Sequence, residues 1–187
     1  MIDKLPQGDT DDEKDKPPAR IPISSAVVTV EAQTYTGEAL TPTPTVTLGG
    51  KTLRNKTDYT VTYKNNQNVG TAKVIITGTG SYQGVKEATF TINKAANPLE
   101  VKVTGKTTFK RASLKKAKKI TIKAGIGQGK VTYSLSKNAK KAKIKVSKKG
   151  KVTLPKKCKK GTYKIIIKAA GNNNYKAGMK TIVIKVN

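Results

Sequence analysis

One stretch near the C-terminus decides the fold of this 187-residue chain: Thr162-Tyr163-Lys164-Ile165-Ile166-Ile167-Lys168. Lysine alternates here with apolar or aromatic side chains along most of its length. Successive side chains of a β-strand point to opposite faces of its sheet. The stretch is therefore predicted to be a half-buried strand with lysine on its solvated face. Lys143–Val146 shows the same alternation.

Short stretches with the same alternation of apolar and polar side chains fill the second half of the chain, separated by turns rich in Gly, Asn and Lys. The predicted strands are Leu99–Val103, Ile120–Lys123, Val131–Leu135, Ile144–Ser147, Lys151–Leu154, Tyr163–Ala169 and Thr181–Val186. The predicted core consists of their apolar positions: Val101, Val103, Ile120, Ile122, Val131, Tyr133, Leu135, Ile144, Val146, Val152, Leu154, Tyr163, Ile165, Ile167, Ile182 and Ile184. We expect Ser113–Lys119 to form one short helical turn.

The first half has the same organisation, and no 3.6-residue apolar period is sustained in it. Its predicted strands are Ala26–Glu31, Thr45–Leu48, Tyr59–Tyr63, Thr71–Thr77 and Val85–Ile92. Gly49-Gly50 is predicted to join two strands as a two-residue hairpin turn. Strands of this length and spacing indicate an all-β sandwich or barrel.

Changes of composition predict the domain organisation. Residues 1–22 hold six acids and several prolines, and are expected to be a disordered acidic linker. Residues 23–94 and 98–187 are expected to be two β-sandwich domains, separated near Pro98. The acidic cluster 9–13 lacks the glycine and the terminal glutamate of an EF-hand loop, so we interpret it as solvated linker.

The distribution of charge separates the two halves more sharply. The chain has 38 Lys plus Arg against 11 Asp plus Glu, and a formal net charge of +27. All the acidic residues lie at or before Glu100, where 11 basic residues balance them; residues 101–187 hold the other 27 basic residues and no acid. The whole net charge therefore belongs to the second half.

Composition also argues against an enzyme. Histidine is absent, which removes the commonest general base and the commonest metal ligand. The second half has no carboxylate, so paired-carboxylate hydrolysis is excluded there. The spacing of the glycines in 125–129 fits no phosphate-binding loop, and we expect a flexible turn. We predict no cofactor and no metal site.

The single cysteine, Cys158, lies in Lys156-Lys157-Cys158-Lys159-Lys160. Four neighbouring cations should favour its thiolate and raise its reactivity. The alternative, which we favour, is a solvent-exposed thiol with no role, because a lone cysteine has no resolving partner. An internal disulfide is excluded.

A set of short motifs in the first half carries a resemblance. These motifs are Tyr35-Thr36-Gly37, Leu40-Thr41-Pro42, Asp58-Tyr59-Thr60-Val61, Tyr63-Lys64-Asn65-Asn66, Val69-Gly70-Thr71-Ala72 and Gly78-Thr79-Gly80-Ser81-Tyr82-Gln83-Gly84. Over residues 24–93 the chain resembles the bacterial immunoglobulin-like (Big-type) domains of Gram-positive surface proteins. Residues 99–187 resemble a related module more loosely, through Gly129–Tyr133, Gly150–Thr153, Lys160–Tyr163 and Ala170–Tyr175.

The resemblance implies tandem immunoglobulin-like sandwiches that serve adhesion, spacing or display, and it implies no catalytic residue. Tyr35, Tyr82 and Tyr175 are expected to be packing anchors whose hydroxyls bond nearby backbone. An aromatic platform for sugars is the alternative. Lys–Asn isopeptide bonds of such modules need a buried carboxylate, which the second half lacks; the first half leaves the question open.

The lysines are the strongest functional signal, because a field of this size attracts polyanions. The candidate polyanion-binding residues are Lys115, Lys116, Lys118, Lys119, Lys140, Lys141, Lys148, Lys149, Lys156, Lys157, Lys159 and Lys160. The candidate partners are an anionic cell-wall polymer or an acidic glycan. Nucleic acid is expected to bind only non-specifically, because Arg111 is the only arginine after residue 100. Simple solubilisation of a strand-rich surface is the alternative interpretation.

We therefore expect a non-enzymatic, monomeric structural or adhesive module of a bacterial surface protein, located outside the cell, at its surface or in the wall. The alternative is an accessory binding region of a secreted wall hydrolase or other surface enzyme. No stretch approaches the ~20 apolar residues of a membrane span. Met1 opens no signal peptide, and we interpret it as the start of an expressed fragment.

Overall fold

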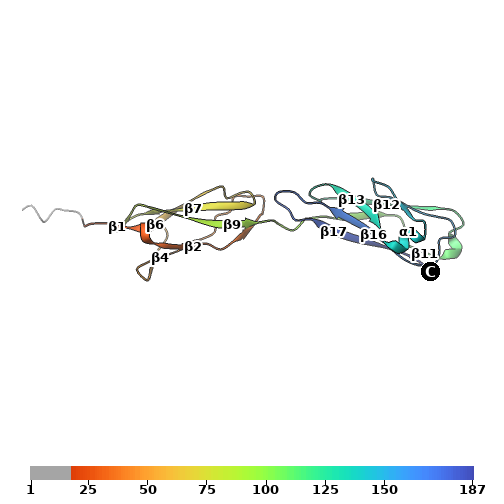
Figure 1. The fold of residues 1–187 in the computed structure, drawn as a ribbon, viewed down its shortest axis with the longest axis horizontal. Coiled ribbons are helices and arrows are strands. Elements are labelled where there is room, and N and C mark those ends of the chain that lie inside the picture. Colours follow the sequence, from red (N-terminus) through yellow and green to blue (C-terminus); the bar gives the residue numbers. More distant parts are fainter. Residues whose placement is uncertain (1–17) are drawn as a thin grey trace, which may run out of the picture. The chain divides into compact units, whose positions relative to one another are not determined.

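The computed structural model describes residues 18–187, which are predominantly β-structure (Figure 1). The described residues fall into two compact units, one of residues 18–31, 41–65 and 72–90 and one of residues 32–40, 66–71 and 91–187. Hydrogen-bonded sheets form two separate sets, one within residues 21–93 and one within residues 101–186. Each set builds its own β-sandwich.

The first sandwich has a four-stranded sheet of order β3-β9-β7-β6 and a three-stranded sheet of order β2-β4-β5, with β1 and β8 as a separate parallel pair. Its strands are β1 (Ile21–Pro22), β2 (Val27–Thr29), β3 (Gln33–Thr34), β4 (Thr45–Leu48), β5 (Lys51–Thr52), β6 (Tyr59–Lys64), β7 (Gly70–Gly78), β8 (Tyr82–Gln83) and β9 (Val85–Asn93). A single 3₁₀ turn, η1 (Ile23–Ser25), follows β1. The five strands predicted from alternation are thus present as β2, β4, β6, β7 and β9.

The predicted hairpin at Gly49-Gly50 is confirmed. Leu48 pairs with Lys51, so the two glycines alone form the turn between β4 and β5. Their φ angles are +55° and +79°, and a two-residue turn of this kind needs positive φ at both positions. Glycine adopts such angles without the steric cost that a Cβ brings.

The core of the first sandwich is small and combines inward positions of both sheets with residues of the turn η1 and the connecting segments. Ile23, Val46, Val74 and Ile76 are fully buried in it. Tyr82, a predicted packing anchor, is also buried, whereas Tyr35 and Tyr175 are half-buried. The described contacts include no bond from the hydroxyl of any of these three tyrosines to the backbone. Other tyrosines make such bonds: the Tyr63 hydroxyl donates to the Pro42 carbonyl at 2.6 Å.

The second sandwich consists of two four-stranded sheets, one of order β10-β12-β15-β14 and the other of order β11-β17-β16-β13. Its elements are β10 (Val101–Thr104), β11 (Thr108–Phe109), η2 (Arg111–Ser113), β12 (Lys118–Ala124), β13 (Val131–Leu135), α1 (Lys137–Lys141), β14 (Lys145–Val146), β15 (Lys151–Leu154), β16 (Gly161–Ala169) and β17 (Gly178–Val186). β11 pairs with β17 in parallel, and the other pairs are antiparallel. The chain is therefore all-β, with two tandem immunoglobulin-like sandwiches.

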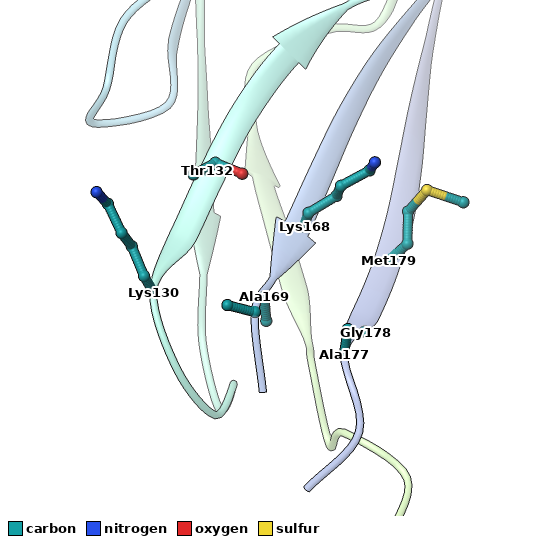
Figure 2. A pocket seen from close by; sticks show the side chains of 8 residues that line it. Lys130, Thr132, Lys168, Ala169, Ala177, Gly178 and Met179 are labelled. Atoms are coloured by element: carbon teal, nitrogen blue, oxygen red, sulfur yellow. The ribbon is translucent and has the colours of Figure 1, made fainter. Parts of the chain in front are cut away.

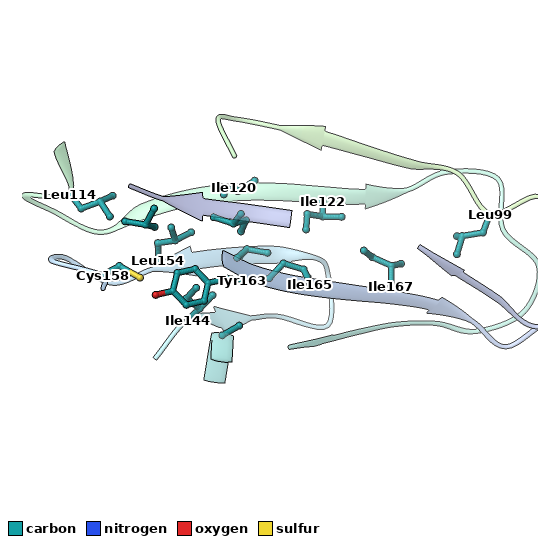
Figure 3. Close-up of a cluster of buried hydrophobic side chains, with 14 of the residues drawn as sticks. Leu99, Leu114, Ile120, Ile122, Ile144, Leu154, Cys158, Tyr163, Ile165 and Ile167 are labelled. Atoms are coloured by element: carbon teal, nitrogen blue, oxygen red, sulfur yellow. The ribbon is translucent and has the colours of Figure 1, made fainter. Parts of the chain in front are cut away.

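A continuous cluster of side chains fills the second sandwich (Figure 3). Every position of the predicted core belongs to this cluster, either buried or packed against it. Each isoleucine or leucine so buried contributes about 1.5–3 kcal/mol of hydrophobic free energy. The buried part of the cluster also holds six residues that were not in the predicted core: Leu99, Leu114, Ala139, Cys158, Ala169 and Val186.

Two local predictions are wrong. The expected helical turn at 113–119 is replaced by the 3₁₀ turn η2, which ends at Ser113, and Lys118–Ala124 is already strand β12. The last residues of the expected 1–22 linker, Ile21 and Pro22, form β1 against Tyr82 and Gln83. Residues 1–17, with the acidic cluster 9–13, lie outside the described residues.

Candidate functional site

Most of the predicted binding lysines are brought to one end of the second sandwich by the strand order. β12 and β15 are antiparallel, with Lys118 opposite Leu154, so the segment before β12 meets the segment after β15. β16 begins at this same end, and α1 follows β13, whose last residue pairs with Ile165 of β16. We call the basic residues here the lysine-rich pole: Arg111, Lys115, Lys116, Lys118, Lys140, Lys141, Lys156, Lys157, Lys159 and Lys160.

The loop from β15 to β16 carries the centre of this pole and is held rigidly. Lys157 has φ +56°, and its N–H donates to the Leu114 carbonyl at 2.9 Å. The Tyr163 hydroxyl donates to the Lys159 carbonyl at 2.6 Å. These bonds fix the backbone of the loop while the lysine side chains on either side remain exposed.

Cys158 is the buried anchor of that loop, and both interpretations of it as an exposed thiol are wrong. Its exposed fraction is 2%, and it packs in the same core cluster as Leu114 and Tyr163 (Figure 3). Burial raises the pKa of the Cys158 thiol, opposite to the expected effect of the flanking cations. The left-handed residue before it turns the side chain inward, which the run of lysines in the sequence did not indicate.

Two neighbouring hollows lie among the pole residues. One, of about 520 Å³, is lined by Arg111, Ala112, Leu114, Lys115, Lys157 and Lys160. The other, of about 310 Å³, is lined by Asn138, Lys141, Ala142, Lys159, Lys160, Gly161, Thr162 and Tyr163. Lys160 lines both, so the hollows adjoin at this side chain. The polar groups that line them are cations, the Asn138 amide and the hydroxyls of Thr162 and Tyr163. Such groups suit an anionic ligand, and none of them is a carboxylate base.

Lys148 and Lys149 lie apart from the pole. They occupy the turn between β14 and β15, in which the Gly150 N–H donates to the Ser147 carbonyl at 3.0 Å. The Gly150 carbonyl accepts the backbone N–H of Ile122. Ile122 lies near the C-terminal end of β12, whereas Lys118 is its first residue. The structure therefore separates these two candidates from the others.

Lys119 belongs to a second cationic surface, the outer face of the sheet β10-β12-β15-β14. The side chains on it are Lys102, Thr104, Lys119, Thr121, Lys123, Lys145, Lys151 and Thr153, which we call the lysine–threonine face. All are exposed except the half-buried Thr153. Apart from Lys119, its lysines were not among the predicted candidates, because they are isolated in sequence and only sheet register brings them together.

A third hollow lies on the opposite sheet, near the start of β13 and the end of β16 (Figure 2). It measures about 360 Å³ and is lined by Lys130, Thr132, Lys168, Ala169, Ala170, Ala177, Gly178 and Met179. Its base is mostly apolar, Met179 is 61% exposed, and two lysines are its only charged groups. It offers no nucleophile–base pair.

The residues that the structure describes include no cluster of His, Cys, Asp or Glu suited to a metal ion. No helix in this part of the chain is long and apolar enough to cross a membrane. Within the same range, Asp58 is the one buried charged residue. Its Oδ2 accepts the Arg54 backbone N–H at 2.8 Å, a bond that lowers the pKa of this carboxyl.

Comparison with known proteins adds little beyond these observations. No protein-family model matches the chain, and no curated protein matches it. Many solved structures match the chain, including the following three, which are similar over most of it. The tandem Ig repeats of Dlar are 13% identical with a TM-score of 0.33, over 87% of this chain and 97% of that one. Domains 4 and 5 of the S-layer protein SbsC are 19% identical with a TM-score of 0.28, over 89% and 98%.

Immunoglobulin domains 1–4 of Sidekick-1 are 11% identical with a TM-score of 0.38, over 87% of this chain. The chain spans 48% of that four-domain structure. Similarity at this level assigns neither a family nor a ligand.

Proposed function

We propose that the chain is a non-enzymatic surface module that attaches electrostatically to an anionic cell-wall polymer or acidic glycan through the lysine-rich pole. One observation carries the proposal. The pole gathers cations from three separate segments of the sequence, 111–118, 140–141 and 156–160, and residues 101–187 contain no acidic side chain to neutralise them. Repulsion among so many like charges favours binding of a polyanion, which releases counterions.

Lysine rather than arginine suits this kind of attachment. A lysine ammonium is a compact point charge without the planar fork that selects one ligand geometry. Binding through such groups tolerates irregular polymers and depends strongly on salt. The surface location belongs to the same proposal and is supported by the motifs over residues 24–93.

The test uses the full chain, with retention measured on purified teichoic acid, heparin and duplex DNA across a salt series. The pole variant changes Lys156, Lys157, Lys159 and Lys160 to Gln. A control variant changes Lys130, Lys164, Lys168 and Lys180 to Gln; it removes the same charge from exposed positions on or beside the opposite sheet.

We expect the pole variant to bind teichoic acid at least tenfold more weakly than the control variant. The slope of log affinity against log salt should become shallower by about 3, since each lost phosphate contact changes it by about 0.7 for a flexible strand. Equal losses in the two variants would show that total charge matters and the pole does not. If the unaltered chain is retained by no polyanion near physiological salt, attachment itself is wrong.

A further inference from the structure

The lysine–threonine face is unusual for the outer side of a sheet. Such a face commonly mixes charges of both signs, which pair across strands. Here every outward side chain of the paired strand residues is Lys or Thr. Lys123 lies directly opposite Lys102, and Thr121 opposite both Thr104 and Lys151. Glu100, which is exposed and lies two residues before Lys102 on the same side of the strand, is the only acidic neighbour of the face within residues 100–187.

The direct pairing of Lys102 with Lys123 is unfavourable in the free protein. Residues opposite each other on antiparallel strands have Cβ atoms about 4.5–5.5 Å apart, and like charges there are destabilising. An anion placed between the two ammonium groups would reverse this repulsion. The pair is therefore suited to a bound phosphate or similar group.

The lysines also repeat at regular intervals. Alternate residues of a strand lie about 6.6–6.8 Å apart, and neighbouring strands about 4.8 Å apart. Lys119 and Lys123 are thus about 13 Å apart along β12, with Thr121 between them. Lys119 lies at the end of the face nearest the pole, although its side chain and that of Lys118 point to opposite sides of β12.

The chemistry of this face narrows the partner. It has no aromatic side chain on which a base or a sugar ring could stack, and no arginine to read base edges. Threonine hydroxyls between the ammonium groups can donate to phosphate oxygens. These features fit a flexible chain of phosphodiesters without aromatic groups.

We infer that the lysine–threonine face binds a linear poly(alditol phosphate), laid along β12 and continuing onto the pole. This inference rests on the proposed attachment function and names its ligand and path. A long polymer can occupy face and pole together, whereas a short one occupies either alone. Affinity should therefore rise with polymer length until both surfaces are filled, because the second contact becomes intramolecular.

The experiment compares synthetic poly(glycerol phosphate) of about three and about thirty units, by titration against the full chain. A face variant changes Lys102, Lys123, Lys145 and Lys151 to Gln, and the control variant described above removes equal charge elsewhere. We expect the face variant to lose at least tenfold more affinity than the control for the long polymer. The ratio of affinities for the long and the short polymer should fall by a similar factor in the face variant.

Heparin and duplex DNA serve as comparators in the same titration. Equal losses of affinity in the face and control variants would overturn the inference. It would also be overturned if the face variant lost as much affinity for heparin or DNA as for poly(glycerol phosphate). In either case, a pole variant that still loses binding would leave the proposed function standing. If the unaltered chain binds no polyanion, both proposals fail together.

Discussion

Lys102 and Lys123 occupy directly opposed positions on β10 and β12, with both side chains on the outer face of the same sheet. The sandwich therefore maintains a repulsive contact that a single substitution would remove. We expect Lys123→Thr to stabilise the free protein by about 0.2–1 kcal/mol. The gain should shrink in 0.5 M salt because the two charges are exposed and screened. Urea denaturation at low and high salt measures both effects.

Lys168→Thr is the matched control, since Lys168 lies opposite Thr132 and Met179 and has no cation across from it. It should change stability by less than Lys123→Thr. Equal stabilisation by the two variants would mean that general charge reduction, and not the opposed pair, is responsible.

The buried thiol gives a second prediction. Because Cys158 is enclosed and its pKa is raised, alkylation by iodoacetamide at pH 7.5 should be slow in the native protein and fast in guanidinium. Mass spectrometry of timed samples measures the two rates. Rapid native labelling would show that the loop between β15 and β16 opens readily, and would contradict the rigid pole described above.

Gly150 supports a prediction about stability. Its φ is +74°, and an added Cβ would collide with the Ile122 carbonyl and the Tyr133 ring. Gly50 has a similar φ of +79° with open space around it. We expect Gly50→Ala to cost about 1–2 kcal/mol through the backbone conformation alone, and Gly150→Ala to cost distinctly more. Denaturation midpoints of the two variants test the difference, and similar midpoints would show that the sheet yields around the new methyl group.

Asp58 should make the first sandwich sensitive to acid. Its pKa is lowered chiefly by the hydrogen bond from the Arg54 backbone N–H. A depressed folded pKa contributes stability that is present above the unfolded value of about 3.9 and is lost as pH falls through the folded value. Asp58→Asn should therefore destabilise the protein at pH 6.5 and reduce its loss of stability between pH 5 and 2.

Glu87→Gln provides the comparison for Asp58. Glu87 pairs with Lys73 at 2.9 Å, but both side chains are about half exposed, and such pairs contribute little. Its effect at pH 6.5 should be the smaller of the two. A larger effect of Glu87→Gln would contradict the structural role given to Asp58.

Alternation of side chains was enough to predict the long strands, because burial on one face imposes a period of two. β4, β13 and β15 begin and end where expected. The two-residue strands β3 and β11 are too short to show a period, and they pair in parallel with β9 and β17 from distant parts of the chain. Helix α1 has only Ala139 as a buried residue, which leaves no apolar pattern to detect.

The candidate site was predictable in part for a similar reason. Pairs of adjacent lysines are visible in the sequence, and the excess of basic over acidic residues in 101–187 predicts a cationic surface. Which of these pairs meet depends on strand order, which separates Lys148 and Lys149 from the pole and adds Arg111 to it. Cys158 shows the limit most clearly, because one left-handed residue turns its side chain from solvent to core.

The parallel pairing of β3 with β9 has a mechanical consequence. Gln33 and Thr34 of β3 lie beside Ile92 and Asn93, the last residues of β9. Tension that reaches β3 from its N-terminal side and β9 from its C-terminal side pulls the two strands past each other along their length. Their hydrogen bonds are then loaded together in shear instead of being peeled apart one by one.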